Sequence, residues 1–491
     1  MNALLLERRF LKDYVRNATN LLLLVLVPVT FVIVAAPRLA DAAKILGGAE
    51  GGAGIETVTA GWAAAFLTGI AMYFLVASSR VTDRRLVLAG LSRGRLARGR
   101  LLSGAMLAAV ATAAALIALG AREGLADPAR VIVGTAMFAL VYLAIGAVVG
   151  ALVATPVNGT VLVMFVWILD VFFGPTLSGS DAQVLWFLPT HFISLWTVNQ
   201  PPGHGGPSAL VWSVVWVVGA LVAAYLMVAP GTGGGRTARP PKRASQLWLG
   251  IRMGLTEWRR TPLLWLLLAA VPTVFILLSE AITPHGSTPV LVRESGVDAT
   301  VMFDPAVIHP GTMAPDAIAS LTALVGVFIV LDARAGDRRL VLAGQRVITA
   351  LATRVVLVVL ASLGVTLVSL AVTASVFSAE QWAVYALGSL VLAITYGLIG
   401  MLLGPVFGRV SGVFMAFLLP FIDLGLGQSP MLGGAPARWA HWMPGYPGMR
   451  VLIDGGLTPG FDEGRTVAAA LAWIVVLTGV VLLVLRRTVK P

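Results

Sequence analysis

The 491-residue sequence contains no cysteine, which excludes disulfide bonds, thiolate metal sites and thiol chemistry. Lysine is also scarce. A phosphate-binding P-loop needs a Gly-Lys pair, and none of the lysines follows a glycine, so this chain carries no P-loop of its own. The few histidines are scattered along the chain, and no metal site is predicted. The lysines are Lys12, Lys44, Lys242 and Lys490.

Charge is scarce as well. Charged residues make up only 12% of the chain, whereas soluble domains carry about 25%. Hydrophobic residues reach 58%, and the mean hydropathy is +0.90. A soluble core of this length cannot hide so much apolar surface, so lipid must be the solvent for most of the chain.

Long apolar runs account for this composition. A membrane-spanning helix needs about 20 mainly apolar residues, and these runs are continuous rather than alternating, which favours helices over barrel strands. The sequence predicts an all-α polytopic membrane protein with about twelve transmembrane helices. The runs near 167 and 415 are short and rich in glycine and proline. The predicted spans centre near residues 28, 69, 110, 142, 167, 219, 270, 323, 363, 392, 415 and 476.

The net charge is +12, and the basic residues that produce it are distributed along the chain in agreement with the predicted topology. Most basic residues fall before the first span, in the segments 80–100, 236–260 and 334–354, and at the C-terminus. The positive-inside rule places these segments and both termini in the cytoplasm. We therefore expect a multi-pass protein of a bacterial plasma (inner) membrane, with the lipid bilayer and not nucleic acid as its surroundings.

The first 17 residues, MNALLLERRFLKDYVRN, carry charges where a signal peptide would be apolar, so no cleavable signal is predicted. Leu6, Phe10 and Tyr14 form an apolar stripe opposite a charged face, which predicts a helix lying on the membrane surface. A less regular amphipathic stretch, LWLGIRMGLTEWRR, follows residue 246.

The octapeptide DRRLVLAG occurs twice, at Asp83–Gly90 and at Asp337–Gly344, with the two copies 254 residues apart. Other pairs follow in the same order: KDYVRN and TEWRRT, WILDVFFG and PFIDLGLG, WFLPTHF and WMPGYPG. This pattern predicts two parallel six-helix repeats, related by an axis along the membrane normal. The predicted divisions are a first half at 1–229, a cytoplasmic linker rich in glycine, proline and basic residues at 230–246, and a second half at 247–491.

Several connections are predicted within the halves. Loops on the outer side follow the first span of each half, at Ala40–Glu56 and Ala281–Pro315. Two proline-bearing aromatic segments, Val184–Asn199 and Arg438–Ile453, are too polar and broken to span a membrane. Broken backbone at membrane depth needs protein or a water-filled cavity around it. We therefore predict re-entrant or interfacial hairpins on the outer face.

The repeated octapeptide needs more than a topological explanation, because any lysine or arginine would hold a loop in the cytoplasm. A short helix with an apolar middle and charged ends is typical of a docking element. Its apolar residues fill a groove on a partner, and its arginines pair with carboxylates at the rim. Two such elements predict two equivalent partner sites.

This arrangement resembles a type-two ATP-binding-cassette (ABC) transporter permease with its two halves fused, similar to actinobacterial exporters of polyketide antibiotics. The resemblance implies an efflux function for an amphipathic small molecule such as an antibiotic, drug or lipid-like compound. It implies two copies of a partner ATPase that bind ATP and Mg, while this chain is no enzyme and holds no cofactor. The implied ATPase-coupling residues are Asp83, Arg84, Arg85, Leu86, Leu88, Ser92, Arg93, Arg95, Asp337, Arg338, Arg339, Leu340, Leu342 and Arg346. The second copy departs from the pattern, with Gln345-Arg346 where Ser-Arg is expected.

Two aspartates end the short fifth spans of the two halves, Asp170 and Asp423. An ionisable group within a span indicates a functional site by default. They line the exit of a substrate pathway, together with Trp167 and Phe172, or they cap the helix ends near water.

Two other functions are consistent with parts of the sequence. A secondary transporter of the major-facilitator type also has twelve spans and a repeated Asp-Arg loop, but its loop is shorter than 80–100 and it needs no ATPase. A membrane-embedded transferase needs a cluster of base, nucleophile or metal ligands. The sparse acidic residues and histidines here do not converge on one.

Overall fold

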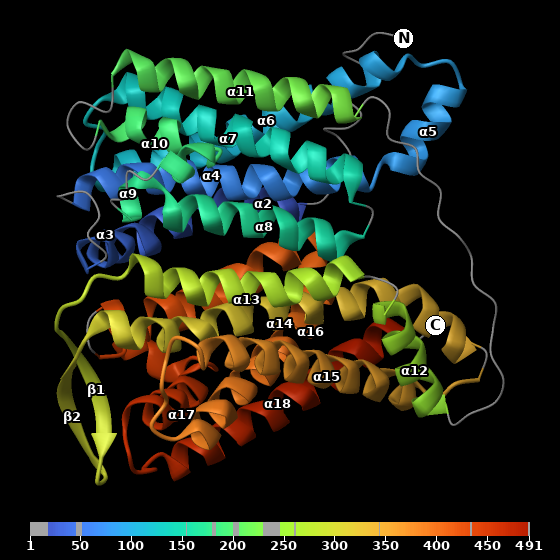
Figure 1. Cartoon of the computed structure of the whole chain (residues 1–491). Helices are drawn as coiled ribbons and strands as arrows, with labels where there is room; N and C mark the ends of the chain where they lie inside the picture. Colours follow the sequence, from blue (N-terminus) through green and yellow to red (C-terminus); the bar gives the residue numbers. More distant parts are fainter. Residues whose placement is uncertain are drawn as a thin grey trace. The chain divides into compact units, whose positions relative to one another are not determined.

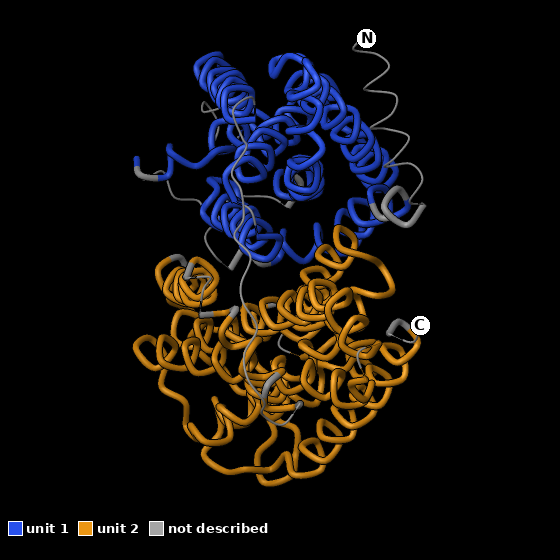
Figure 2. The backbone as a smooth tube through the Cα atoms, turned by 90° about the vertical axis from the view of Figure 1, so that its right-hand side faces the viewer, with its two compact units in different colours: residues 1–237 blue, residues 238–491 orange. Residues whose placement is uncertain are grey.

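A computed structural model describes residues 18–45, 52–153, 155–178, 183–199, 206–228, 246–259, 262–342, 344–432 and 435–489. The chain folds into two compact units, Met1–Thr237 and Ala238–Pro491 (Figure 2). The division falls within the predicted linker, most of which lies outside the described residues. The predicted N-terminal surface helix at 1–17 also lies outside them.

The described residues contain 11 helices that are long and apolar enough to cross a membrane. The prediction of a mainly helical multi-pass membrane protein is confirmed. The spans are Leu24–Asp41, Gly54–Ala77, Arg93–Arg122, Pro128–Leu152, Pro156–Leu177, Pro207–Val228, Leu263–Ala281, Pro305–Leu342, Val347–Thr373, Trp382–Leu426 and Gly464–Arg487.

The count differs from the predicted twelve at one place. Trp382–Leu426 is 45 residues long, about twice what one crossing requires. Gly408 lies inside it with φ 77° and ψ −168°, a conformation that breaks the helix and suits glycine. The predicted spans near 392 and 415 are therefore the two arms on either side of this break.

The first unit is built around one buried helix. Figure 1 shows α4 lying among its neighbours, and it packs on α6, α7 and α8. The elements in chain order are α2 (Ala18–Thr30), the π-helix η1 (Phe31–Ala35), α3 (Ala36–Ile45), α4 (Gly52–Ala77), α5 (Arg80–Leu88), α6 (Arg93–Arg122), α7 (Pro128–Leu152), α8 (Pro156–Phe173), α9 (Pro175–Ser178), η2 (Gln183–Phe187), α10 (His191–Val198) and α11 (Pro207–Val228).

The second unit has a similar centre, in which α14 packs chiefly on the long helix α16. Its elements are α12 (Gln246–Arg259), α13 (Pro262–Ile282), β1 (Thr288–Glu294), β2 (Val297–Phe303), α14 (Pro305–Leu342), α15 (Val347–Thr373), α16 (Trp382–Pro420), the π-helix η3 (Phe421–Leu426), η4 (Pro430–Leu432), η5 (Arg438–Trp442), α17 (Tyr446–Leu457) and α18 (Gly464–Val489).

The predicted outer loop Ala281–Pro315 is largely structured, and it contains the two strands of the described residues. Strands β1 and β2 form an antiparallel hairpin across the turn Ser295-Gly296. Both turn residues have positive φ, 54° and 79°, which suits the right-handed twist of a two-residue hairpin. Helix α14 then begins at Pro305, ten residues before the predicted end of the loop.

The two predicted outer hairpins each contain a 3₁₀ turn followed by a helix. In the first unit η2 leads through Pro189 into α10, and in the second η5 leads through Pro444 into α17. The first arms carry exposed aromatic side chains, which are typical of a membrane interface. These are Trp186, Phe187, Trp439 and Trp442.

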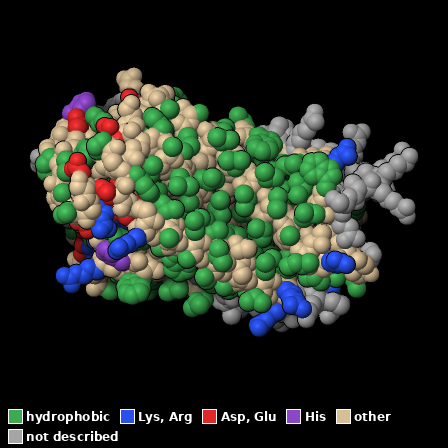
Figure 3. Space-filling view, turned by 90° about the horizontal axis from the view of Figure 1, so that it is seen from below, with side chains coloured by type: hydrophobic (Ala, Val, Ile, Leu, Met, Phe, Trp, Pro, Cys, Tyr) green, Lys and Arg blue, Asp and Glu red, His purple; other side chains and the backbone are tan. Residues whose placement is uncertain are grey.

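The exposed surface is largely apolar in its middle. Figure 3 shows one face on which hydrophobic side chains cover the centre and charged side chains gather toward the ends. Exposed side chains of α15 and α18, such as Leu367 and Val475, belong to this class. Such a belt suits contact with the hydrocarbon of a bilayer.

Glycines let the central helices approach closely. A Cβ on Gly146 of α7 would overlap the carbonyl oxygen of Gly69 in α4, and a Cβ on Gly400 of α16 would overlap that of Ala323 in α14. Small residues at helix contacts allow this backbone approach in membranes, where packing rather than the hydrophobic effect drives association.

We expect Gly146→Ala and Gly400→Ala each to lower the free energy of unfolding by about 1–3 kcal/mol, because the added methyl must displace backbone. Tryptophan fluorescence during unfolding in detergent measures the change. Gly219→Ala and Gly479→Ala are matched controls, since nothing lies within 4 Å of a Cβ at either position. Equal effects of the four substitutions would contradict the close-packing account.

Candidate functional site

The first copy of the repeated octapeptide forms an exposed helix. None of the residues of α5 is buried. Arg84, Arg85 and Leu88 are exposed, with Leu88 79% accessible, and Leu86 is half-buried. After the octapeptide, Ser92, Arg93 and Arg95 are exposed as well, and Arg95 Nε donates to Ser92 Oγ at 3.0 Å.

The second copy is the end of a span rather than a separate helix. Helix α14 runs without interruption from Pro305 to Leu342, whereas a turn at 78–79 separates α5 from α4. Its residues are nevertheless exposed in the same way. The exposed residues are Arg338, Arg339, Leu340, Leu342 and Arg346.

The two copies end with the same backbone geometry. Gly90 and Gly344 have φ of 92° and 95°, which glycine adopts readily at the end of a helix. The next N–H bonds back across the turn, Leu91 N to Leu86 O at 3.0 Å and Gln345 N to Leu340 O at 2.9 Å. This geometry places Arg346 where Ser92 stands in the first copy, and both residues begin the next helix with extended backbone.

The aspartate of each octapeptide is bound to the following span. Arg100 of α6 donates to both carboxylate oxygens of Asp83, at 2.6 and 3.3 Å. Arg354 of α15 donates to Asp337 in the same way, at 2.5 and 3.0 Å. Each pair is 17 residues apart. Two-point contacts of this kind fix geometry as well as charge, so Asp83 and Asp337 hold the loops in place while the neighbouring arginines stay exposed.

A second contact binds each loop to a later span. Arg80, at the start of α5, donates to the carbonyl oxygens of Gly150 at 2.9 Å and Val153 at 2.8 Å, at the end of α7. A cation at a helix C-terminus is favourable. Partial burial lowers the pKa of Arg80, and Tyr73 acts in the opposite direction. In the second unit, Asp332 of α14 pairs with Arg409, next to the break in α16.

The aspartates predicted for a pathway or a helix cap lie inside the protein. Asp170 is 2% exposed. It accepts hydrogen bonds from Thr190 N at 3.1 Å, Thr190 Oγ1 at 2.6 Å and Tyr142 OH at 2.9 Å. Its carboxylate therefore joins α8 to the start of α10 and to α7.

Asp423 has an equivalent set of partners. It accepts from Gly445 N at 2.9 Å, in front of α17, from the Tyr396 hydroxyl and from Gln428 Nε2. Each aspartate thus fastens an outer hairpin to the core of its unit. Trp167 is also buried, with Nε1 donating to Trp62 O at 2.9 Å, and Phe172 is half-buried.

The sequence analysis did not identify the side chains that bind the loop aspartates and the buried aspartates. Arg100 and Arg354, like Tyr142 and Tyr396, stand 254 residues apart, the same offset as the octapeptides. Comparing the two halves position by position at this offset, and not only in runs of identical residues, would have identified these four side chains. The octapeptide keeps its aspartate and its glycine for a structural reason, since the first forms the ion pair and the second forms the turn.

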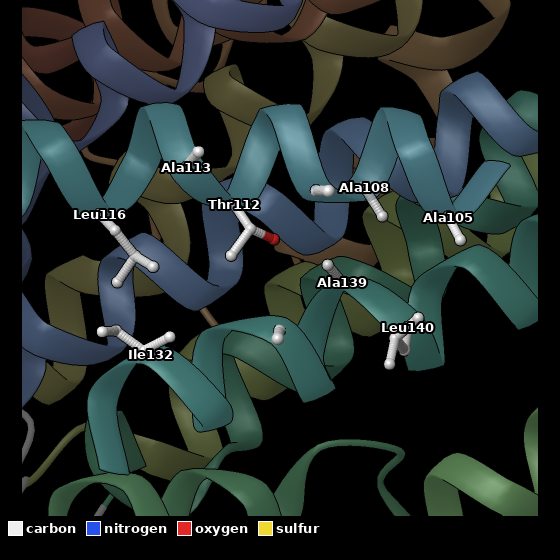
Figure 4. Close-up of a pocket in the computed structure, with 10 residues that line it drawn as sticks. Ala105, Ala108, Thr112, Ala113, Leu116, Ile132, Ala139 and Leu140 are labelled. Atoms are coloured by element: carbon white, nitrogen blue, oxygen red, sulfur yellow. The ribbon is translucent and has the colours of Figure 1, made fainter. Parts of the chain in front are cut away.

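An open groove of about 350 Å³ lies on the surface between α6 and α7 of the first unit. Figure 4 shows Leu116 and Ile132 facing one another across it, with Thr112 and Ala139 further along. Thr112 is its one polar lining residue, so the groove suits contact with an apolar group such as a lipid chain. The other lining residues are Ala105, Ala108, Ala109, Ala113, Ala136 and Leu140.

No group of three or more metal-binding side chains occurs in the described part of the chain. No protein-family model matches the sequence, and none of the curated proteins searched matches it.

We expect Asp83→Ala to cost about 3–5 kcal/mol of unfolding free energy, because it removes the carboxylate that faces the Arg100 charge, and only 4% of the Arg100 side chain is exposed. Asp337→Ala should cost less, since the Arg354 side chain is 19% exposed. Denaturant unfolding in detergent measures both changes. The control is Asp127→Ala, whose side chain is 59% exposed and caps α7; it should cost about 1 kcal/mol. A cost for Asp83→Ala as small as that of the control would argue against a structural ion pair.

Proposed function

We propose that this chain is the membrane-spanning permease of an ATP-driven ABC exporter, with ATP hydrolysis on separate subunits. One observation carries the proposal. In each unit, the loop between the second and third spans presents exposed arginines and leucines while an aspartate fixes it to the third span. A docking surface must be accessible to a partner and rigidly joined to what it moves, and these loops combine both properties.

The contacts suggest how movement would pass through the chain. Arg84 and Arg85, or Arg338 and Arg339, pair with carboxylates at the rim of a groove on the ATPase. Leu88 and Leu342 fill the groove. Displacement of the loop then pulls on α6 through Asp83 and on α15 through Asp337, and on the later spans through Arg80 and Asp332.

Equivalent contacts support the duplication of a six-span unit and hence two copies of the ATPase. The loop ion pairs and the buried tyrosine–aspartate pairs recur at offsets of 253–254 residues along the chain. A parallel duplication gives both loops the same side of the membrane. The positive-inside rule assigns that side to the cytoplasm of a bacterial plasma membrane.

The residues present suggest which subunit would bind ATP and which would contact the substrate. ATP and Mg would be held by the partner, because no lysine of this chain follows a glycine. The proposed substrate class is an amphipathic small molecule, which follows from the resemblance to antibiotic exporters. Asp170 and Asp423 would position the outer hairpins at the exit.

The first test is purification of the tagged full chain from its native membrane, trapped with ATP and vanadate, followed by mass spectrometry. We expect two P-loop ATPase copies per chain. A chain that purifies alone and transports with an ion gradient would favour a secondary transporter of the major-facilitator type instead.

A charge-reversal series tests the docking loops. Arg84→Glu/Arg85→Glu and Arg338→Glu/Arg339→Glu should each abolish ATPase co-purification at that loop and lower transport at least tenfold, since repulsion replaces attraction at a charged rim. Membrane insertion should be unchanged. Arg486→Glu/Arg487→Glu reverses two adjacent exposed arginines of α18 and is the matched control. Normal partner binding and transport in both loop variants would remove the docking hypothesis.

A further inference from the structure

Helix α14 carries a buried carboxylate that neither the loops nor the hairpin contacts use. Asp316 lies in the span Pro305–Leu342 and is 7% exposed. Neither of its carboxylate oxygens has a hydrogen-bond partner among the described residues. An ionisable group at such a place is costly unless it is paired, so Asp316 requires an explanation.

The neighbours of Asp316 that can be identified among the described residues carry no positive charge. Its two oxygens lie 3.5 and 3.6 Å from where a Cβ of Gly425 would stand, which places the backbone of η3 against the carboxylate. Asp423, on the same turn of η3, interacts electrostatically with Asp316, and so does Tyr396 of α16. Gln428 follows with a buried Oε1 that also lacks a partner.

The hydrogen bonds assign different roles to the two carboxylates. Asp423 accepts from three donors, Tyr396, Gln428 and Gly445 N, which stabilises its charged form. Asp316 receives none. Two neighbouring carboxylates out of water cannot both be charged without a positive charge between them, and no ion pair joins either one to a described residue. His309, two turns earlier on α14, is engaged with Thr283.

The first unit supplies an internal comparison. Position 62, which precedes Asp316 by the same 254 residues that separate Tyr142 from Tyr396, is a tryptophan. There Asp170 stands as a single carboxylate, held by Tyr142 and Thr190. The second carboxylate and the unpartnered amide oxygen therefore occur in the second unit and not beside Asp170.

The local backbone also differs from an ordinary helix. Asp423 and Gly425 lie in the π-helix η3, directly after Pro420. Single π turns are rare and often occur at functional sites, because they change how side chains and carbonyl groups are presented. Asp170, by contrast, lies within the α-helix α8.

We propose that Asp316, Asp423 and the Oε1 of Gln428 form a binding site for one monovalent cation, a proton or Na⁺, within the second unit. Either ion supplies the single positive charge that the two carboxylates lack. A proton resides on Asp316 and is released when Na⁺ enters, and carboxylate and amide oxygens are ligands that suit a hard cation. The site is independent of the proposed function, since it needs neither an ATPase nor a transported substrate.

Infrared difference spectroscopy of the purified full chain in lipid nanodiscs tests the site. The carbonyl band of a protonated carboxyl is followed from pH 5 to 9, in choline chloride and in NaCl. We expect a band that Asp316→Asn removes and that diminishes as the pH rises. Loss of the band on exchanging choline for Na⁺ at fixed pH identifies the metal ion as a ligand. Loss with pH alone identifies the proton.

The matched control is Asp170→Asn, which alters a buried aspartate that already has its donors and should leave the response intact. Asp316→Glu keeps the carboxyl and should shift the midpoint of the titration rather than abolish it, which separates loss of the site from a failure to fold. A wild-type spectrum that responds to neither pH nor Na⁺ overturns the proposal, as does an undiminished response in folded Asp316→Asn.

Discussion

Buried polar groups in a membrane must find their partners within the chain, because no water is present in the hydrocarbon to hydrogen-bond them. The aspartates of this protein show how strongly that constraint organises the fold. Asp170 and Asp423 are buried and are bound by tyrosines and by backbone N–H groups of the hairpins, and at the two exposed loops Asp83 and Asp337 are bound by arginines of the next span. These few contacts determine where each loop and each hairpin lies relative to the helices of its own unit. Asp316 is the exception, and for that reason it is informative.

Much of the helical architecture was predictable from the sequence, because apolar runs of membrane length have few alternatives in lipid. The expected spans near 392 and 415 are present as the two arms of one helical segment, which is broken at Gly408. The β-hairpin at Thr288–Phe303 was not predicted. Its short strands lie in an outer loop, where composition and hydropathy carry little information about fold, and only the Ser295-Gly296 turn signals it.

The candidate site was predictable in part. Repetition identified the octapeptides, and the structure explains which of their residues are structural. Repetition marks Arg100 and Arg354 as equivalent positions, but it does not show that they pair with Asp83 and Asp337, because a contact between residues 17 apart across a turn leaves no periodic pattern in the sequence. Repetition also gave no indication of Asp316. Repetition highlights what two halves share, whereas position 316 matters because position 62 differs from it.

The continuity of α14 has a mechanical consequence. From the depth of Asp316 to the exposed Arg338 and Arg339 this helix continues without a turn, whereas the first loop is a separate helix beyond a turn at 78–79. In the proposed exporter, a force on Arg338 and Arg339 would therefore pass along one helix to the depth of Asp316. A force on Arg84 and Arg85 would instead pass across the turn at 78–79 and through the contacts of Arg80 and Arg100 with the neighbouring helices. In the proposed exporter, the two loops would therefore transmit equal movements of the ATPase to their own units by different routes.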